Sequence, residues 1–218
     1  MSKSKFTTVG RKFLMAFSGF FLMFFLLQHL TINLLSVINV DAFNEVSYFM
    51  GNNPVVQFAL QPILIFAVFF HFIMGFVLEA KNRGARSIKY AYNRPSENSS
   101  WVSRNMIYSG LVVLAFLGLH FYDFWIPEIT EKYIVGDSQV GKDFHLHLVE
   151  KFADPVRVIL YIVSFVLLAL HLLHGFQSSF QSVGISKGKN NIKKFGNIFA
   201  IAVPAGYVFI AIFHYLQH

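Results

Sequence analysis

Five long stretches of almost wholly apolar residues restrict the fold of this chain more than any other feature. They span approximately residues 13–37, 55–78, 106–126, 158–176 and 198–216, and Asp123 is the one Asp, Glu, Lys or Arg within them. A membrane-spanning helix needs about 20 consecutive apolar residues. Charged residues make up 13% of the chain, about half the share that is typical of soluble domains. The sequence therefore predicts an all-α integral membrane protein with five transmembrane helices, in a single domain over residues 1–218.

The basic residues indicate how these helices are oriented. Residues 3–12, 81–104 and 187–194 hold 14 of the 18 Lys and Arg residues, and the connection between the first two runs holds none. Because short basic loops stay cytoplasmic, we expect a multi-pass protein of the bacterial cytoplasmic membrane with its N-terminus inside and its C-terminus outside. The net charge of +7 then reflects topology, and we expect no nucleic acid partner. The long outer connection should contain an amphipathic helix around Gly141–Phe152.

The chain contains no cysteine. This excludes disulfides, cysteine-ligated iron–sulfur clusters and the covalent attachment of c-type haem. Any metal cofactor must therefore be held by histidine or oxygen. The first apolar run is too long for the core of a secretory signal and is followed by no small-residue cleavage pattern, so we interpret it as a retained helix.

Four of the predicted helices each contain a histidine, and these histidines fall at two depths. At 1.5 Å per residue, His29 and His120 lie roughly 25 Å from the basic residues that mark the inner face, whereas His71 lies roughly 15 Å from it. His171 is expected at a depth similar to that of His71. Ionisable residues inside a membrane usually face the bundle interior and serve a function. Two histidines that face each other across a bundle are what bis-imidazole ligation of a haem requires.

Other interpretations of these residues remain open at this point. A histidine within a membrane also serves as a hydrogen-bonding partner between helices, and a histidine relay is typical of proton-coupled transporters that bind no haem. Gly75 and Gly175 each follow a histidine by four residues. They would let a flat macrocycle approach the backbone, or they would simply permit close helix packing.

Short motifs around the histidines resemble the single-chain, five-helix, di-haem cytochrome b subunit that anchors bacterial succinate dehydrogenases and fumarate reductases. The motifs lie in the same order along essentially the whole chain: Gln28-His29-Leu30 with Asn33, Asp41-Ala42-Phe43-Asn44, Phe49-Met50, Phe70-His71 with Gly75, His120, and His171 with Gly175. The resemblance implies a di-haem bundle of the first four helices with the fifth helix outside. The cytochrome b subunit of a hydrogenase or formate dehydrogenase is the alternative within redox chemistry.

The resemblance also implies which residues and partners are involved. His71 and His171 would bind the iron of a proximal haem, and His29 and His120 that of a distal haem. The partners would be a flavoprotein that interconverts succinate and fumarate, an iron–sulfur subunit on the cytoplasmic face, and a quinone, with menaquinone as one candidate. The physiological direction of the reaction is not encoded in these motifs.

Several further residues are weaker candidates. His174, one turn after His171, could compete with it as a haem ligand, although the resemblance and the shared spacing to Gly75 and Gly175 favour His171. Otherwise it would bind a haem propionate or a neighbouring helix. The other candidate propionate partners, each of which also suits a solvated helix end, are Arg11, Lys12, Ser18 and Arg104. The quinone-site candidates on the outer side, each of which also suits an interfacial position, are Asp123, Asn33, Asn44 and Glu45. We expect His214 to be structural, without an obvious partner, and His145 and His147 to be exposed in the outer loop or to relay protons.

Overall fold

Five long apolar helices make up most of the molecule. The structure, a computed structural model, describes residues 8–84, 105–135, 143–185 and 188–217. The helices that are long and apolar enough to span a membrane are Val9–Ile38, Val56–Gly84, Met106–Val135, Pro155–Ser182 and Lys189–Leu216. The described residues form no strand. The prediction of an all-α membrane protein with five spanning helices is confirmed.

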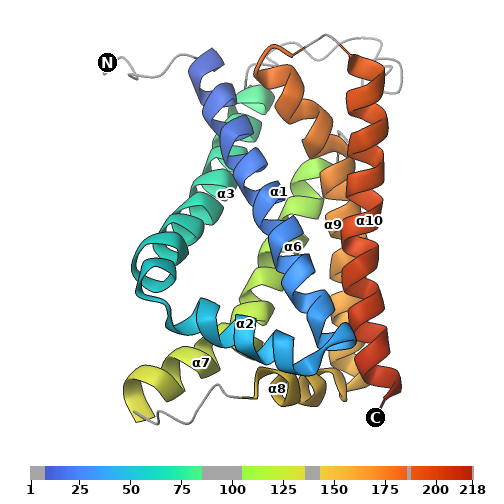
Figure 1. Cartoon of the computed structure of the whole chain (residues 1–218). Coiled ribbons are helices and arrows are strands. Elements are labelled where there is room, and N and C mark those ends of the chain that lie inside the picture. The colour runs from blue at the N-terminus through green and yellow to red at the C-terminus, as the bar shows by residue number, and fades with distance from the viewer. Residues whose placement is uncertain (1–7, 85–104, 136–142, 186–187, 218) are drawn as a thin grey trace.

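Four of these helices form a ring, and the fifth lies outside it (Figure 1). Helix α1 (Thr8–Ile38) packs along α3 (Gln61–Gly84) and α9 (Pro155–Ser182), and α6 (Met106–His120) packs along α9 and α3. Helix α10 (Lys189–Leu216) packs against α9 and α1. Therefore α1 lies diagonally opposite α6 in the ring, and α3 lies diagonally opposite α9.

Small residues allow α10 to lie close to its neighbours. Ala200 and Ala211 are completely buried, and a Cβ atom added at Gly196 would lie 2.5 Å from the ring of Phe176 on α9. Similarly, a Cβ at Gly206 would lie 2.9 Å from Leu30 on α1. Close approach of backbones is a main source of stability between helices in a membrane, where no hydrophobic effect drives them together.

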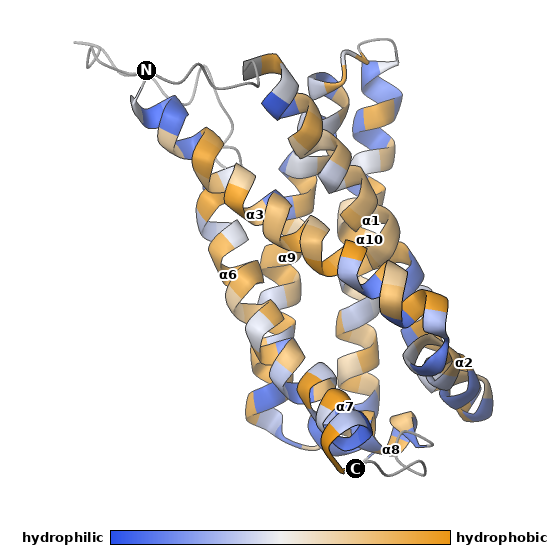
Figure 2. Cartoon of the chain, turned by 90° about the vertical axis from the view of Figure 1, so that its left-hand side faces the viewer, coloured by the Kyte–Doolittle hydropathy of each residue, from blue (hydrophilic) through white to orange (hydrophobic). Residues whose placement is uncertain are grey.

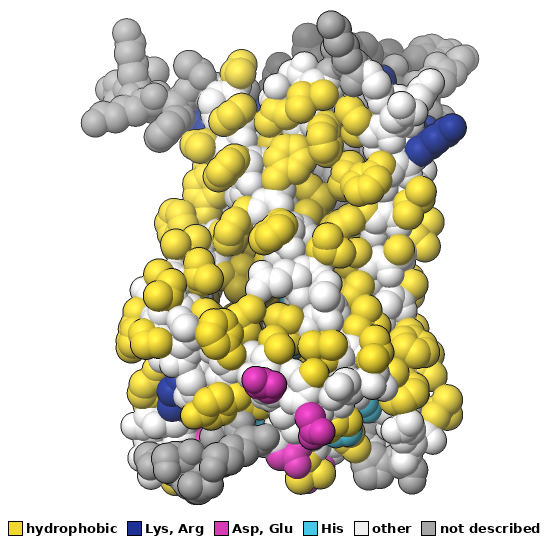
Figure 3. Space-filling model, viewed as in Figure 1, with side chains coloured by type: hydrophobic (Ala, Val, Ile, Leu, Met, Phe, Trp, Pro, Cys, Tyr) yellow, Lys and Arg dark blue, Asp and Glu magenta, His cyan; other side chains and the backbone are white. Residues whose placement is uncertain are grey.

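The outward faces of the helices are apolar. Large side chains such as Phe24, Phe58 and Phe66 are each about two-thirds exposed or more, and apolar residues dominate the middle of the molecule while polar ones gather at its ends (Figures 2 and 3). A soluble monomer rarely exposes apolar patches of this extent. The surface therefore fits a lipid environment, as expected for a multi-pass membrane protein.

Two short helices cross one end of the ring (Figure 1). Helix α2 (Val40–Asn52) is capped by Asn39, whose side chain accepts a hydrogen bond from the backbone of Ala42. Helix α8 (Phe144–Phe152) is capped in the same way by Asp143. An amphipathic helix was predicted where α8 lies, although residues 141–142 fall outside the described ranges. Helix α2 was not predicted, because residues 38–54 were interpreted as a loop.

The third spanning helix is interrupted by π-helical turns. It continues from α6 through η2 (Phe121–Trp125), α7 (Ile126–Thr130) and η3 (Glu131–Val135), and a further π-helical segment, η1 (Val56–Leu60), precedes α3. π-helical turns are rare and occur often at functional sites. The turn at η2 begins immediately after His120, and it contains Asp123.

The two ends of the described chain lie at opposite ends of the bundle, as five crossings require (Figure 1). Acidic side chains gather at the end that carries α2 and α8, whereas Lys and Arg side chains are visible at both ends of the face in view (Figure 3). We refer to the end with the start of α1 as the basic end, and to the end with α2 and α8 as the acidic end.

Candidate functional site

The structure brings the four membrane histidines together in two pairs. His71 on α3 faces His171 on α9, with 6.4 Å between ring centres and an angle of 68° between the ring planes. His29 on α1 faces His120 on α6, with 5.8 Å between ring centres and an angle of 85°. Each pair joins diagonally opposite helices of the ring. The rings of each pair therefore face each other across the interior of the bundle.

The two pairs lie at different depths. His71 contacts Ser18 on α1, whereas the other pair contains His29 on the same helix, eleven residues further along. At 1.5 Å per residue, the pairs are separated by about 16 Å along the bundle. We call His71 and His171 the inner pair, nearer the basic end, and His29 and His120 the outer pair, nearer the acidic end.

The spacing within each pair fits a metal ion bound between two imidazoles. With metal–nitrogen bonds of about 2 Å and about 1 Å from nitrogen to ring centre, two axial imidazoles have ring centres about 6 Å apart. Among the described residues, no three His, Cys, Asp or Glu side chains converge on a common metal position. Two ligands per site are sufficient for a haem, because the macrocycle supplies the remaining four nitrogens. The donor set therefore fits two haems.

Four contacts around the inner pair occur twice, once in each half of the chain. Ser18 and Ser109 contact Nδ1 of His71 and His171, at 3.0 and 3.3 Å. The next residue in each case is a glycine, and a Cβ added at Gly19 or Gly110 would lie 3.6 Å from Cε1 of the same histidine.

The remaining two repeated contacts involve methionines and glycines. Each serine donates its hydroxyl proton to the carbonyl oxygen three residues earlier, that of Met15 or Met106. The methyl groups of these methionines lie beside Gly75 and Gly175, at 3.5 and 3.8 Å from an added Cβ. The four contacts between α1 and α3 are thus repeated between α6 and α9.

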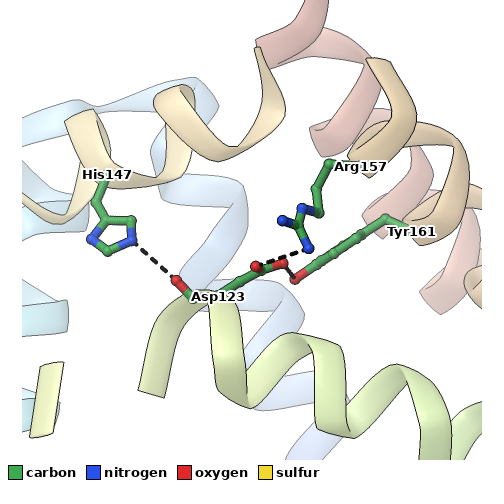
Figure 4. Close-up of polar contacts among 4 residues, drawn as sticks. All are labelled: Asp123, His147, Arg157 and Tyr161. Carbon is green, nitrogen blue, oxygen red and sulfur yellow. Dashed lines mark hydrogen bonds and ion pairs between the residues drawn. The ribbon is translucent and has the colours of Figure 1, made fainter. Parts of the chain in front are cut away.

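A second polar group lies at the acidic end, where Asp123 is wholly buried (Figure 4). Its Oδ2 accepts a hydrogen bond of 2.8 Å from the hydroxyl of Tyr161, and its Oδ1 lies 3.1 Å from Nη1 of Arg157. Nε2 of His147 lies 3.0 Å from the backbone oxygen of Asp123. The ring of Tyr161 lies 6.4 Å from that of His120. A charge removed from solvent is tolerated in a membrane only with such partners, and this cluster borders the outer pair.

His214 has partners that the sequence did not indicate. Its side chain is completely buried, and its Nε2 lies 2.9 Å from the hydroxyl oxygen of Ser36 on α1. The ring of His145 lies 5.3 Å away. These contacts are partners that the sequence did not make obvious, and they fit the expected structural role of His214. His145 and His147 are half-buried, so the expectation that they are exposed is wrong; helix α8 brings both of them against the bundle.

The remaining quinone candidates lie at the same end. Asn33 donates to the backbone oxygen of His29 at 2.8 Å, and its amide nitrogen lies 3.4 Å from Nδ1 of that ring. Asn44 joins α2 to α8, because its oxygen accepts from the backbone of His145 and its amide donates to Asp143. Glu45 is exposed on α2. Asp123 and Asn33 thus border the outer pair, whereas Asn44 connects two helices.

The propionate candidates lie toward the basic end. Arg11 is half-buried and Lys12 exposed in the first turns of α1, and His174 is half-buried one turn beyond His171. A propionate would have to compete for Ser18 with its bonds to Met15 and His71. Arg104 lies outside the described residues.

Sequence reasoning missed several residues of these sites, namely Ser36, Ser109, Arg157 and Tyr161. The sequence does contain a pattern that would have identified Ser109. Met15-Ala-Phe-Ser-Gly19 and Met106-Ile-Tyr-Ser-Gly110 share Met, an aromatic residue, Ser and Gly, and each serine precedes the outer histidine of its helix by eleven residues. No comparable pattern identifies Arg157, which lies just before the predicted fourth run.

Comparison with known proteins supports the resemblance inferred from the motifs. The chain is similar to the succinate dehydrogenase cytochrome b558 subunit of Bacillus subtilis, with 25% identity over 166 residues, which cover 74% of this chain and 73% of that protein. No protein-family model matches the chain. No solved structure matches it. The resemblance to a cytochrome b membrane-anchor subunit of a succinate dehydrogenase is thus confirmed by a curated relative.

Proposed function

We propose that this chain is the membrane-anchor subunit of a succinate:quinone oxidoreductase. In this proposal it binds two b-type haems, the proximal one between His71 and His171 and the distal one between His29 and His120. The whole chain, residues 1–218, would act as one cytochrome b domain. The succinate and fumarate chemistry would belong to a partner flavoprotein.

One observation carries the proposal above all others. The two histidine pairs have ring centres 6.4 and 5.8 Å apart, and both pairs lie across the diagonals of one four-helix ring. Hydrogen bonds between neighbouring helices account for the contacts of His71 and His171 with serines, but they do not account for the pairing of each histidine with one on the diagonally opposite helix. A proton relay requires a succession of titratable groups, whereas these residues form two separate pairs about 16 Å apart. The name of the relative from Bacillus subtilis agrees with this choice.

The two haems, when bound, would supply one-electron carriers between an iron–sulfur subunit and a membrane quinone. The residues of the chain contribute position and environment. The imidazoles fix the depth of each site, and the apolar ring excludes water from both.

The orientation in the membrane follows from the basic residues. We propose that the basic end faces the cytoplasm, because basic connections remain on that side. The inner pair would then lie nearer the docking face of the iron–sulfur subunit. The outer pair would lie nearer the external face, where Asp123 and Asn33 are the candidates for contact with menaquinone or another quinone.

A reduced-minus-oxidised absorption spectrum of the purified complex tests this proposal, with haem quantified per chain. We expect two b-type haems, at least one of which is reduced by succinate. Two haems that are reduced by dithionite but not by succinate would retain the four-histidine site. They would indicate that the chain belongs to another oxidoreductase, such as a hydrogenase or formate dehydrogenase. A complex without haem would overturn the proposal and favour a transporter.

A further inference from the structure

Each histidine of the inner pair has a serine hydroxyl close to its ring nitrogen Nδ1. Ser18 lies 3.0 Å from Nδ1 of His71, and Ser109 lies 3.3 Å from Nδ1 of His171. Both serines are buried, with 6% and 8% of their surface exposed. Each contact links one helix to its neighbour, α1 to α3 and α6 to α9. Because both serines are buried, water cannot easily replace them as partners of the histidines.

The direction of these hydrogen bonds follows from an inventory of protons. A serine hydroxyl has one proton to donate. Ser18 donates it to the carbonyl oxygen of Met15 at 2.8 Å, and Ser109 donates it to that of Met106 at 2.9 Å. Such a bond to the preceding turn is common for serine in membrane helices. The serine oxygens can therefore only accept from the histidines, so that Nδ1 of each ring must carry a proton.

This arrangement determines which ring nitrogen can bind a metal. A neutral imidazole with its proton on Nδ1 has a bare Nε2. We infer that Ser18 and Ser109 are positioning residues that hold His71 and His171 in this tautomer and orientation, so that both rings present Nε2 to one haem iron from opposite sides. The inference rests on the proposed function. It assigns the two serines to the imidazoles and not to the haem propionates.

Among the described residues, neither histidine of the outer pair has a serine at Nδ1. The serine contact therefore does not follow from the helix geometry alone. Nδ1 of His29 lies 3.4 Å from the amide nitrogen of Asn33, which is a donor and not an acceptor. Nδ1 of His120 is buried and has no hydrogen-bond partner among the described residues. The two outer histidines still occupy equivalent places in the repeat. The serine contact is therefore specific to the inner pair.

Acceptors at Nδ1 affect the metal through the ligand. Partners of this kind fix the tautomer and raise the basicity of the imidazole, and their removal typically weakens metal binding by about 10- to 100-fold. A more basic ligand favours ferric iron. Replacement of either serine should therefore loosen the inner haem and raise its midpoint potential. Because the two serines act on opposite sides of the same iron, either replacement should change the same haem.

The test uses Ser18→Ala and Ser109→Ala in the complete complex. Haem content, the low-spin ferric electron paramagnetic resonance signals and the potentials of both haems are measured. Ser164→Ala is the matched control, because Ser164 is equally buried on α9 and donates to the carbonyl of Leu160 at 2.7 Å. Ser18→Thr and Ser109→Thr retain the hydroxyl and should restore the original signals.

The outcomes separate this inference from the proposed function. We expect both alanine variants to change the signal and raise the potential of the same haem, or to lose that haem, while Ser164→Ala leaves both haems unchanged. A wild-type complex with two haems that neither alanine variant alters would overturn the inference and leave the proposed function intact. Equal changes in the alanine and threonine variants would also overturn it, because the hydroxyl would then not be the cause. A wild-type complex without haem would instead overturn the proposed function.

Discussion

Arg157 and Asp123 form an ion pair of 3.1 Å in which the carboxylate is completely removed from solvent and the guanidinium side chain is 23% exposed. The hydroxyl of Tyr161 satisfies the other carboxylate oxygen. The two charged residues belong to different spanning helices, and their contact lies where α9 begins. This pair therefore fastens two helices of the ring together beside the outer histidines.

Removal of the arginine alone should destabilise the protein strongly. Arg157→Leu would leave a buried carboxylate without its counter-charge, a change that typically costs about 3–5 kcal/mol. Thermal unfolding in detergent would measure this as a large drop in the midpoint. Arg83→Leu is the control, because its pair with Glu79 is largely exposed and such pairs contribute little to stability. The double variant Asp123→Asn with Arg157→Leu should recover part of the loss, and equal loss in the single and double variants would contradict the buried-charge explanation.

If the four histidines bind two haems as proposed, replacement of one of them should remove one haem. His171→Leu should reduce the haem content from two per chain to one, since its ring faces His71 at 6.4 Å. His174→Leu, one turn away, should retain both haems and serves as the control. The pyridine haemochrome assay gives the count directly. If His174→Leu lost a haem and His171→Leu did not, the assignment of the inner pair would be wrong.

The contact between α9 and α10 should tolerate no added methyl group at Gly196. A Cβ there would lie 2.5 Å from Cδ1 of Phe176 and 3.0 Å from Cγ, and the ring cannot withdraw without moving its neighbours. Overpacking of this kind typically costs about 1–3 kcal/mol. Gly118→Ala on α6 is the control, because no heavy atom lies within 4 Å of its added Cβ. Thermal midpoints of the two variants should differ, with Gly196→Ala the less stable.

The orientation can be tested with single cysteines, because the chain has none of its own. Lys193→Cys lies at the basic end and Glu45→Cys at the acidic end, and both native residues are exposed. A membrane-impermeant maleimide added to intact cells should label Glu45→Cys only. Inverted vesicles should label Lys193→Cys only. The reverse pattern would show that the basic end faces outward.

Much of this fold could be predicted because its main elements are encoded locally. Runs of about 20 apolar residues specify the spanning helices directly, and counting residues from the flanking charges placed the four histidines at two depths. Helix α2, which lies across the end of the bundle, was missed. Its sequence mixes polar and apolar residues and contains no long apolar run, so that it resembles a connecting loop.

The partners of buried polar residues could not be predicted. Apolar residues lie on every face of these helices, so the apolar pattern alone does not reveal how each helix is rotated against its neighbours. The contact of Ser36 with His214 spans nearly the whole chain, and it depends on where α10 docks. That of Tyr161 with Asp123 depends on the rotation of α9 relative to the π-helical turn at η2. Such contacts depend on how the helices pack, which cannot be predicted from composition.

The position of α10 has one more consequence. Four crossings would return the chain to the face from which α1 starts, and only the fifth carries it across again. The end of α10 therefore cannot reach anything that is bound at the basic end, and a protein or label fused there would sit on the opposite side of the bilayer. Among the described residues, a partner at the basic end would meet the start of α1 and the ends of the other spanning helices on that side.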